Sequence, residues 1–126
     1  MPRQQKRTTW ILIGLVLIGL VAYGVWQSRR PGQYDQFAAC LKEKNAIFYG
    51  AFWCPHCRDQ KKLFGKSAKR LPYVECSTPN GNSQTSICKE KKVENYPTWE
   101  FGDNSRETGL VPLAKLAAKT GCTLPQ

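Results

Sequence analysis

The stretch that decides the fold is residues 46–57, which read AIFYGAFWCPHC. Its first part, Ala46 to Phe52, is apolar and rich in residues that favour strands, so it predicts a buried β-strand. The motif Cys54-Pro55-His56-Cys57 follows directly. Pro55 suits the first turn of a helix, because its missing N–H would have no partner there. These residues therefore predict a strand that leads straight into a helix, with two cysteines at the junction.

The segments on either side of this stretch predict the rest of an α/β fold. Helices are predicted around residues 34–41, over 55–71, near 84–92 and from Pro112 to a cap at Gly121. Further strands are predicted at residues 72–76, 98–101 and 106–110, the last two as a hairpin, and residues 77–83 form a turn-rich loop. The order of these elements predicts an α/β fold in which helices flank a small mixed sheet.

A Cys-x-x-Cys motif at the start of a helix predicts redox chemistry. The helix dipole and the free backbone N–H groups stabilise a thiolate at the first cysteine, and the second lies one turn on, within disulfide reach. Cys54 is therefore expected to be the exposed nucleophile and Cys57 the more buried resolving thiol. His56, the single histidine in the chain, can add positive charge or a hydrogen bond to the Cys54 thiolate.

Two other interpretations of this motif have less support from the sequence. A zinc site needs a second close cysteine pair, and the next cysteines, Cys76 and Cys88, are not closely spaced, so no metal is expected. A purely structural disulfide is disfavoured too, because so short a loop at a helix start is strained and reducible.

Two motifs resemble the thioredoxin superfamily. They are Trp53-Cys54-Pro55-His56-Cys57 and, further on, Tyr96-Pro97-Thr98. The resemblance implies a thioredoxin-like fold with a cis proline at Pro97 beside the active site. It also implies that Trp53, Tyr96 and Pro97 bind the substrate, whose backbone pairs with the backbone next to that proline.

A closer resemblance is to the thioredoxin-like domain that is fused to, or partnered with, bacterial vitamin K epoxide reductase homologues. It is carried by residues 49–57, 61–65, 73–76 and 96–99, which read YGAFWCPHC, KKLFG, YVEC and YPTW, and it covers about residues 36–122. It implies a protein that oxidises the thiols of exported proteins and passes the electrons to a quinone-linked membrane partner of that family. No bound cofactor is expected.

The strand before the motif departs from the thioredoxin pattern. Thioredoxins keep a buried carboxylate six residues before the first active cysteine, where this chain has Phe48, and residues 46–52 contain no acid. Carboxylate-assisted proton transfer from that position is therefore in doubt. The Pro-His dipeptide is the one found in strongly oxidising relatives, and it favours oxidation over reduction.

Four further cysteines lie outside the motif. Cys76 and Cys88 bracket the loop of residues 77–87, and a structural disulfide between them is favoured over a second redox pair that relays electrons. Cys40 and Cys122 either form a disulfide or act as small buried apolar residues. Six cysteines allow about 15 connectivities, and the sequence leaves that choice open.

The N-terminal part predicts a membrane anchor. Residues 10–26 carry no charge and no proline, with Trp10 and Trp26 at the ends, as is typical of a transmembrane helix. An uncleaved signal anchor is favoured over a cleaved signal peptide. The expected organisation is a basic flank (1–9), the anchor (10–26), a linker (27–33) and a thioredoxin-like domain (34–126).

Charge predicts the orientation of this anchor. Arg3, Lys6, Arg7 and the amino group precede it, whereas Arg29 and Arg30 follow it. This places the N-terminus in the cytoplasm and the domain in the periplasm or an equivalent oxidising lumen, where six cysteines in one small domain also belong.

The net charge of +10 does not indicate nucleic-acid binding. Half of this charge lies on the residues that flank the anchor, and the sequence has no motif of a nucleic-acid-binding module. Six basic residues follow the motif: Arg58, Lys61, Lys62, Lys66, Lys69 and Arg70. They form either a solvated helix face or a docking surface for anionic headgroups or an acidic partner loop.

Two rival functions remain open at this point. A membrane-tethered reductase or isomerase, for example one that serves cytochrome maturation, would use the same residues at a different potential. A non-enzymatic adaptor held together by disulfides is the less favoured hypothesis, because structural disulfides do not require the motif Trp53-Cys54-Pro55-His56-Cys57.

Overall fold

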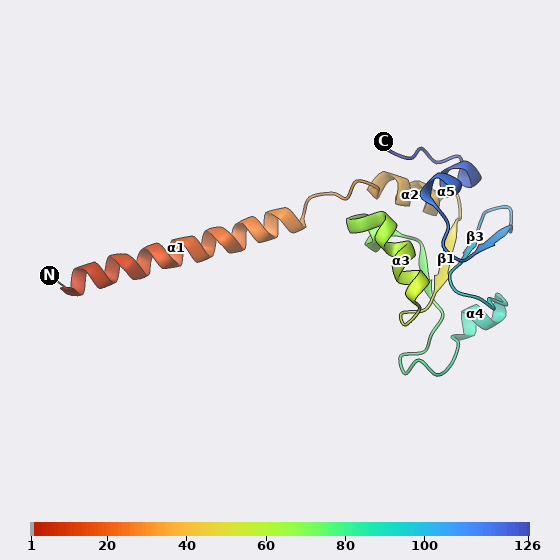
Figure 1. Cartoon of the computed structure of the whole chain (residues 1–126), viewed down its shortest axis with the longest axis horizontal. Helices are drawn as coiled ribbons and strands as arrows, with labels where there is room; N and C mark the ends of the chain where they lie inside the picture. The colour runs from red at the N-terminus through yellow and green to blue at the C-terminus, as the bar shows by residue number, and fades with distance from the viewer. Residues whose placement is uncertain (1) are drawn as a thin grey trace. The chain divides into compact units, whose positions relative to one another are not determined.

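The computed structural model describes residues 2–126, with side chains from Arg3 onward. By its internal contacts the chain separates into two units, one that ends at Arg30 and one that begins at Pro31. Figure 1 shows the first as one long helix and the second as a sheet with several shorter helices. Each unit is described by itself.

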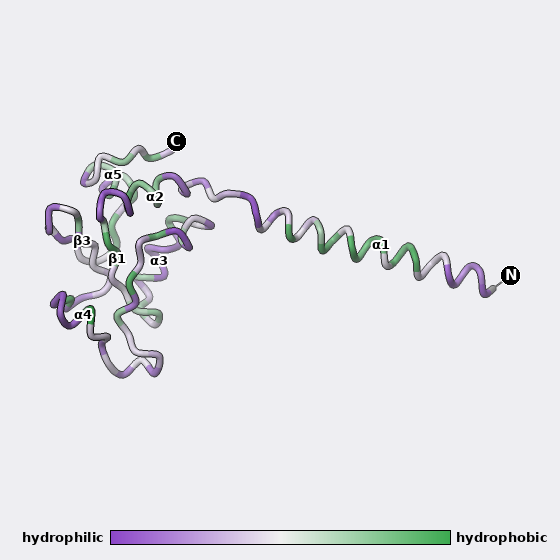
Figure 2. Tube along the Cα trace, turned by 180° about the vertical axis from the view of Figure 1, so that it is seen from behind, coloured by the Kyte–Doolittle hydropathy of each residue, from purple (hydrophilic) through white to green (hydrophobic). Residues whose placement is uncertain are grey.

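The first unit is helix α1, Pro2–Ser28. Its segment Arg3–Ser28 has a mean hydropathy of 2.1 over its most apolar part, which is long and apolar enough to cross a membrane. Figure 2 shows hydrophobic residues in the middle of α1 and hydrophilic ones at both ends. The segment predicted to span the membrane, residues 10–26, lies within a longer helix. The predicted basic flank is helical from Pro2 onward, and Met1 lies outside the described residues.

The second unit has an α/β architecture, which confirms the predicted fold class. Its elements are α2 (Asp35–Glu43), β1 (Ile47–Gly50), α3 (Pro55–Phe64), the 3₁₀ helix η1 (Gly65–Arg70), β2 (Tyr73–Glu75), α4 (Ser86–Glu90), β3 (Thr98–Glu100), β4 (Arg106–Thr108) and α5 (Leu113–Thr120). The strand order is β2-β1-β3-β4. β1 pairs parallel with β2 and antiparallel with β3, and β3 pairs antiparallel with β4, so the sheet is mixed.

The sheet separates two buried clusters. Successive side chains of a strand point to opposite faces, and the neighbours Phe48 and Tyr49 of β1 belong to different clusters. The larger cluster joins Phe48 to buried residues of α2, α3 and α5. The smaller one joins Tyr49 to Cys88 of α4 and to Val93. β1 is thus covered on both faces, and the Cys54–Cys57 motif follows directly after this buried strand.

The helix after the motif is shorter than predicted. One helix was expected over residues 55–71, but α3 ends at Phe64 and η1 continues to Arg70. Gly65 adopts a φ of +53°, which glycine accepts readily and which an α-helix excludes. The apolar residues of 63–71 keep a helical period in the sequence, so the break is visible only through this glycine.

A buried glutamine ties α3 to the segment before α5. Gln60 is fully buried, its Nε2 donates to the Val111 carbonyl at 3.0 Å, and its Oε1 accepts from the Val111 N–H at 2.8 Å. Both polar groups of the Val111 backbone are therefore satisfied by one side chain.

Gln60→Ala is expected to lower the free energy of unfolding by about 2–4 kcal/mol, because it leaves two buried backbone groups without partners. The measurement is thermal unfolding of the full chain in detergent, followed by near-UV circular dichroism. The matched control on the same helix is Lys62→Ala, whose side chain is 76% exposed and which should change stability little. Equal effects of the two substitutions would contradict this role for Gln60.

Candidate functional site

The first cysteine of the motif caps helix α3. Cys54 has φ −76° and ψ 119° at the N-cap, and Pro55 is the first helical residue. The backbone N–H of Cys57 donates to the Cys54 sulfur at 3.3 Å. A sulfur in this position faces the positive end of the helix dipole and accepts a hydrogen bond from an otherwise unpaired N–H group.

Both cysteines of the motif are free, and both are buried. Cys57 is 1% exposed and Cys54 is 5% exposed. The sequence predicts an exposed Cys54, and the structure differs here because the segment before Pro97 lies against the sulfur. The Cys54 thiol donates to the Tyr96 carbonyl oxygen at 3.8 Å. Cys54 is nevertheless the more accessible of the two thiols.

Burial dominates the acid–base behaviour of the second cysteine. It raises the pKa of the Cys57 thiol far above the usual range, and the neighbouring Cys54 raises it further, whereas the Lys61 ammonium acts in the opposite direction. A raised thiol pKa means that Cys57 stays protonated at neutral pH. Cys57 is therefore expected to react slowly with electrophiles, because the thiolate is the reactive form of a cysteine.

The low reactivity expected of Cys57 predicts the order of alkylation. In the reduced full chain, iodoacetamide at neutral pH should modify Cys54 first and leave Cys57 largely intact, because alkylation requires the thiolate. Peptide mapping by mass spectrometry after short exposure gives the two extents. The disulfide-bonded Cys76 serves as the internal control for unwanted reduction. Modification of Cys57 at the same rate would contradict the assignment of the low-reactivity thiol.

The segment beside the motif contains the cis peptide bond Tyr96–Pro97. The Trp53 ring packs edge-on against the Tyr96 ring with centroids 6.0 Å apart. Trp53 Nε1 donates to the Ser77 hydroxyl at 2.9 Å, and Gln84 Nε2 donates to the Tyr96 hydroxyl at 2.6 Å. The structure thus brings together the predicted substrate-binding residues, and the loop after β2 holds both rings in place.

A small cavity of about 160 Å³ opens beside these rings. Trp53 and Tyr96 form one side of it, and residues 81–84 of the loop form another. Phe52 and Trp53 are themselves 51% and 47% exposed. The surface next to the cysteine pair is therefore aromatic.

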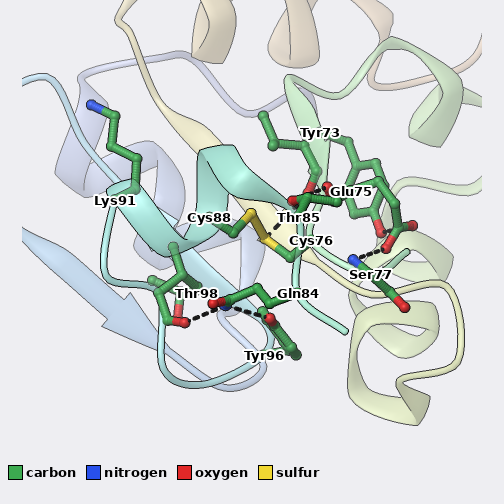
Figure 3. Close-up of a disulfide and its surroundings, with 12 residues drawn as sticks. Tyr73, Glu75, Cys76, Ser77, Gln84, Thr85, Cys88, Lys91, Tyr96 and Thr98 are labelled. Carbon is green, nitrogen blue, oxygen red and sulfur yellow. Dashed lines mark hydrogen bonds between the residues drawn. A yellow bond between two sulfur atoms is a disulfide. The ribbon is translucent and has the colours of Figure 1, made fainter. Parts of the chain in front are cut away.

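The other four cysteines form two disulfides. Cys76 pairs with Cys88 over a separation of 12 residues, and Cys40 pairs with Cys122 over a separation of 82. Figure 3 shows that the first disulfide joins Cys88 of α4 to Cys76, the residue after β2, next to Thr85 and Gln84. The second joins α2 to the residues after α5. Within residues 2–126, no group of three or more His, Cys, Asp or Glu side chains is placed to hold a metal ion.

Several of the other charged residues near the motif have individual partners. His56 is exposed, and among the described contacts none joins it to the Cys54 sulfur. Lys62 pairs with Asp59 at 3.0 Å, and Arg70 pairs with Asp35 at 3.0 Å. Lys61 turns toward β2, where its Nζ lies 3.6 Å from the centre of the Tyr73 ring.

The structure adds two residues that the motif alone does not indicate, Tyr73 and Glu75 of β2. The Tyr73 hydroxyl donates to Glu75 Oε2 at 2.8 Å. Glu75 Oε1 accepts from the backbone N–H groups of Phe52 at 3.2 Å and Ser77 at 2.9 Å. The sequence signal was present: a Tyr-x-Glu spacing puts both side chains on one face of a strand. Only the parallel pairing with β1 shows that this face lies beside the motif.

The comparisons with known proteins agree with this geometry. A family model described as Thioredoxin matches residues 29–119. The chain is also similar to a protein of Arabidopsis thaliana named thiol-disulfide oxidoreductase LTO1, with 42% identity over 95 residues. That match covers 70% of this chain and 25% of the relative, so the chain spans about a quarter of the relative's length. Because the family model covers most of the chain, the protein belongs to the thioredoxin family.

Proposed function

We propose that this protein is a membrane-anchored thiol–disulfide oxidoreductase in which Cys54 and Cys57 alternate between dithiol and disulfide. The observation that carries the proposal is the position of the two free cysteines at the start of α3, with the Cys57 N–H 3.3 Å from the Cys54 sulfur. The name of the Arabidopsis relative, thiol-disulfide oxidoreductase, supports the same class of reaction.

The proposed reaction oxidises substrate thiols. A substrate thiolate attacks Cys54 of the Cys54–Cys57 disulfide, a mixed disulfide forms on Cys54, and Cys57 leaves with the electron pair. A second substrate thiolate attacks the substrate sulfur of that mixed disulfide, which releases an oxidised substrate and leaves both cysteines reduced. The dithiol has then gained two electrons from the substrate, and a further oxidant must remove them.

The neighbouring residues have supporting roles in this proposal. Pro55 begins the helix that stabilises the Cys54 thiolate, and an exposed His56 adds positive charge at the opening of the site when it is protonated. The substrate segment lies extended beside Trp53 and pairs with the backbone at Tyr96 and Pro97, in the manner of an added strand. The contact between Cys54 and the Tyr96 carbonyl, at 3.8 Å, supports this choice of backbone.

The proposed direction is oxidation, with a quinone-linked vitamin K epoxide reductase-like membrane protein as the electron acceptor. The Pro-His dipeptide between the cysteines and the resemblance to domains that accompany such reductases support this choice. Residues 10–26 anchor the protein, residues 1–9 lie in the cytoplasm, and residues 34–126 lie in the periplasm or an equivalent oxidising lumen beyond the linker of residues 27–33. The basic residues before the anchor and two disulfides in the domain support this arrangement.

The reduction potential of the Cys54/Cys57 pair tests the direction. The full chain in detergent is equilibrated with redox buffers, and the two thiols are counted by alkylation and mass. We expect a potential closer to the about −120 mV of a strong oxidant than to the about −270 mV of thioredoxin. A value near that of thioredoxin would favour a reductase or isomerase. Cys54→Ser is the control that removes the signal.

The acceptor is tested by reconstitution. The full chain, a vitamin K epoxide reductase homologue and a quinone are placed in one proteoliposome, and oxidation of a reduced client protein is followed. Oxidation that needs all three components supports the relay. Oxidation at the same rate without the homologue would exclude it as the acceptor.

A further inference from the structure

The residues next to the buried thiol are carried by β1 and β2. Gly50 at the end of β1 has no side chain, and a Cβ there would lie 3.0 Å from the Cys57 sulfur and 2.9 Å from Cε2 of Tyr73, with the Tyr73 hydroxyl at 3.4 Å. The Cys57 sulfur and the Tyr73 phenol thus border the same small space. Any larger residue at position 50 would fill it.

A carboxylate is fixed behind that phenol. Gly50 of β1 is in register with Glu75 of β2, and Glu75 accepts the Tyr73 hydroxyl through one oxygen and two backbone N–H groups through the other. Figure 3 shows the bond from the Ser77 N–H to this carboxylate. One of the two N–H groups belongs to Phe52, two residues before Cys54. The carboxylate is thus held between the phenol and the active-site loop.

The chemistry at Cys57 needs a proton carrier. Whenever Cys57 attacks or leaves a disulfide on Cys54, its sulfur loses or gains a proton, yet the side chain is 1% exposed. β1 supplies no acid, because Phe48 stands in its centre and stacks on Trp99 with ring centroids 5.0 Å apart. The groups nearest to the Cys57 sulfur on a neighbouring element are therefore the candidates to carry this proton.

We propose that Tyr73 and Glu75 carry this proton, the Tyr73 phenol passing it between the Cys57 sulfur and the Glu75 carboxylate. When Cys57 attacks the mixed disulfide, its proton moves to the phenol oxygen, and the phenol's own proton moves to Glu75. The Cys57 thiolate then bonds to Cys54, and the substrate sulfur leaves with the electron pair. When Cys57 is the leaving group, the same two protons move back.

The charged surroundings are consistent with this path. The titratable and charged groups that act on Cys57 and Tyr73 are Cys54, Lys61 and Glu75. Burial, the hydrogen bond to Glu75 and the charges of both cysteines raise the pKa of Tyr73. The phenol is therefore suited to relay a proton as a neutral group and not to hold the charge itself. Lys61, over the Tyr73 ring, offsets part of the negative charge.

The inference rests on the proposed exchange reaction, and a two-phase experiment separates them. The reduced full chain in detergent is mixed with 5,5′-dithiobis(2-nitrobenzoate) by stopped flow. The first nitrothiobenzoate released reports attack by Cys54, and the second reports attack by Cys57 on the mixed disulfide. Across a range of pH, the variants Glu75→Gln and Tyr73→Phe are compared with the wild type and with Glu94→Gln, an exposed acid that matches the change in charge.

We expect both variants to slow the second phase at least about tenfold at neutral pH, in line with general base catalysis, while the first phase and Glu94→Gln stay at wild-type rates. In the wild type the second phase should level off above the range where a carboxylate ionises. In Glu75→Gln it should rise about tenfold per pH unit, because the thiolate then depends on hydroxide.

Two results would overturn the inference. An unchanged second phase with an unchanged pH profile would show that another group takes the proton. A second phase that is faster in Glu75→Gln would show that the carboxylate only repels the thiolate. Absence of a first phase in the wild type would instead overturn the proposed function itself, since that phase depends on Cys54 alone.

Discussion

Replacing Cys57 with alanine is expected to leave substrate proteins covalently attached to Cys54 and to reduce turnover to the uncatalysed background. Cys54 can still form the mixed disulfide in this variant, but no second thiol of the pair resolves it or restores the active disulfide. The measurement is non-reducing electrophoresis of the full chain isolated from cells in which export is active, with mass spectrometry of the adducts. Reductant should release them.

The matched control is Cys54→Ala, which keeps Cys57. It should give few adducts, because the remaining thiol is 1% exposed and its raised pKa keeps it protonated at neutral pH. Adducts that form through Cys57 in this control, and not through Cys54 in the first variant, would reverse the assignment of the attacking cysteine.

The local part of the site follows from the sequence alone. A cysteine followed by proline after an apolar run specifies an N-cap and a first helical residue by backbone chemistry, and the structure has Cys54 and Pro55 in these places. The mixed sheet also follows, because each strand has a recognisable apolar or turn-bounded segment. In each of these cases, the local structure is determined by residues that are close together in the sequence.

The parts that were not predicted depend on contacts between distant segments. The burial of Cys54 comes from Tyr96, 42 residues away. The carboxylate at Glu75 reaches the site only because β2 lies parallel to β1. The break at Gly65 has a local cause in its positive φ, but a single glycine inside a helical pattern is often tolerated. The helical periodicity of the apolar residues therefore led to the prediction of one continuous helix.

The basic residues after the motif show the same limit. Their spacing left a solvated face and a docking surface as alternatives, and the structure adds individual contacts for some of them. Arg70 is paired with Asp35 of α2, and Lys61 covers the Tyr73 ring. Both partners lie on elements other than the one that carries the basic residue, so no pattern along residues 58–70 alone could assign them.

Removing the Cys40–Cys122 disulfide is expected to destabilise the domain more than removing Cys76–Cys88. The two bonds close loops with separations of 82 and 12 residues. In the chain-entropy model, loops of these lengths correspond to about 4–5 and about 3 kcal/mol. At about 4–8 °C per kcal/mol, both losses are large in thermal unfolding. The two double alanine variants of the full chain are compared under oxidising conditions, and each serves as the other's control for the loss of two cysteines.

Activity in these variants decides whether Cys76 and Cys88 are structural or carry electrons. This disulfide anchors the loop that holds Trp53 and Tyr96 through Ser77 and Gln84, so its loss should weaken substrate binding without stopping exchange at Cys54. Below the melting temperature, we expect client oxidation to continue with a raised KM and a kcat close to that of the wild type. Loss of kcat without loss of stability would assign the pair to electron relay. Reduction of Cys76–Cys88 at the same potential as Cys54–Cys57 would support that same conclusion. A structural disulfide is expected to resist a reductant that reduces the Cys54–Cys57 disulfide.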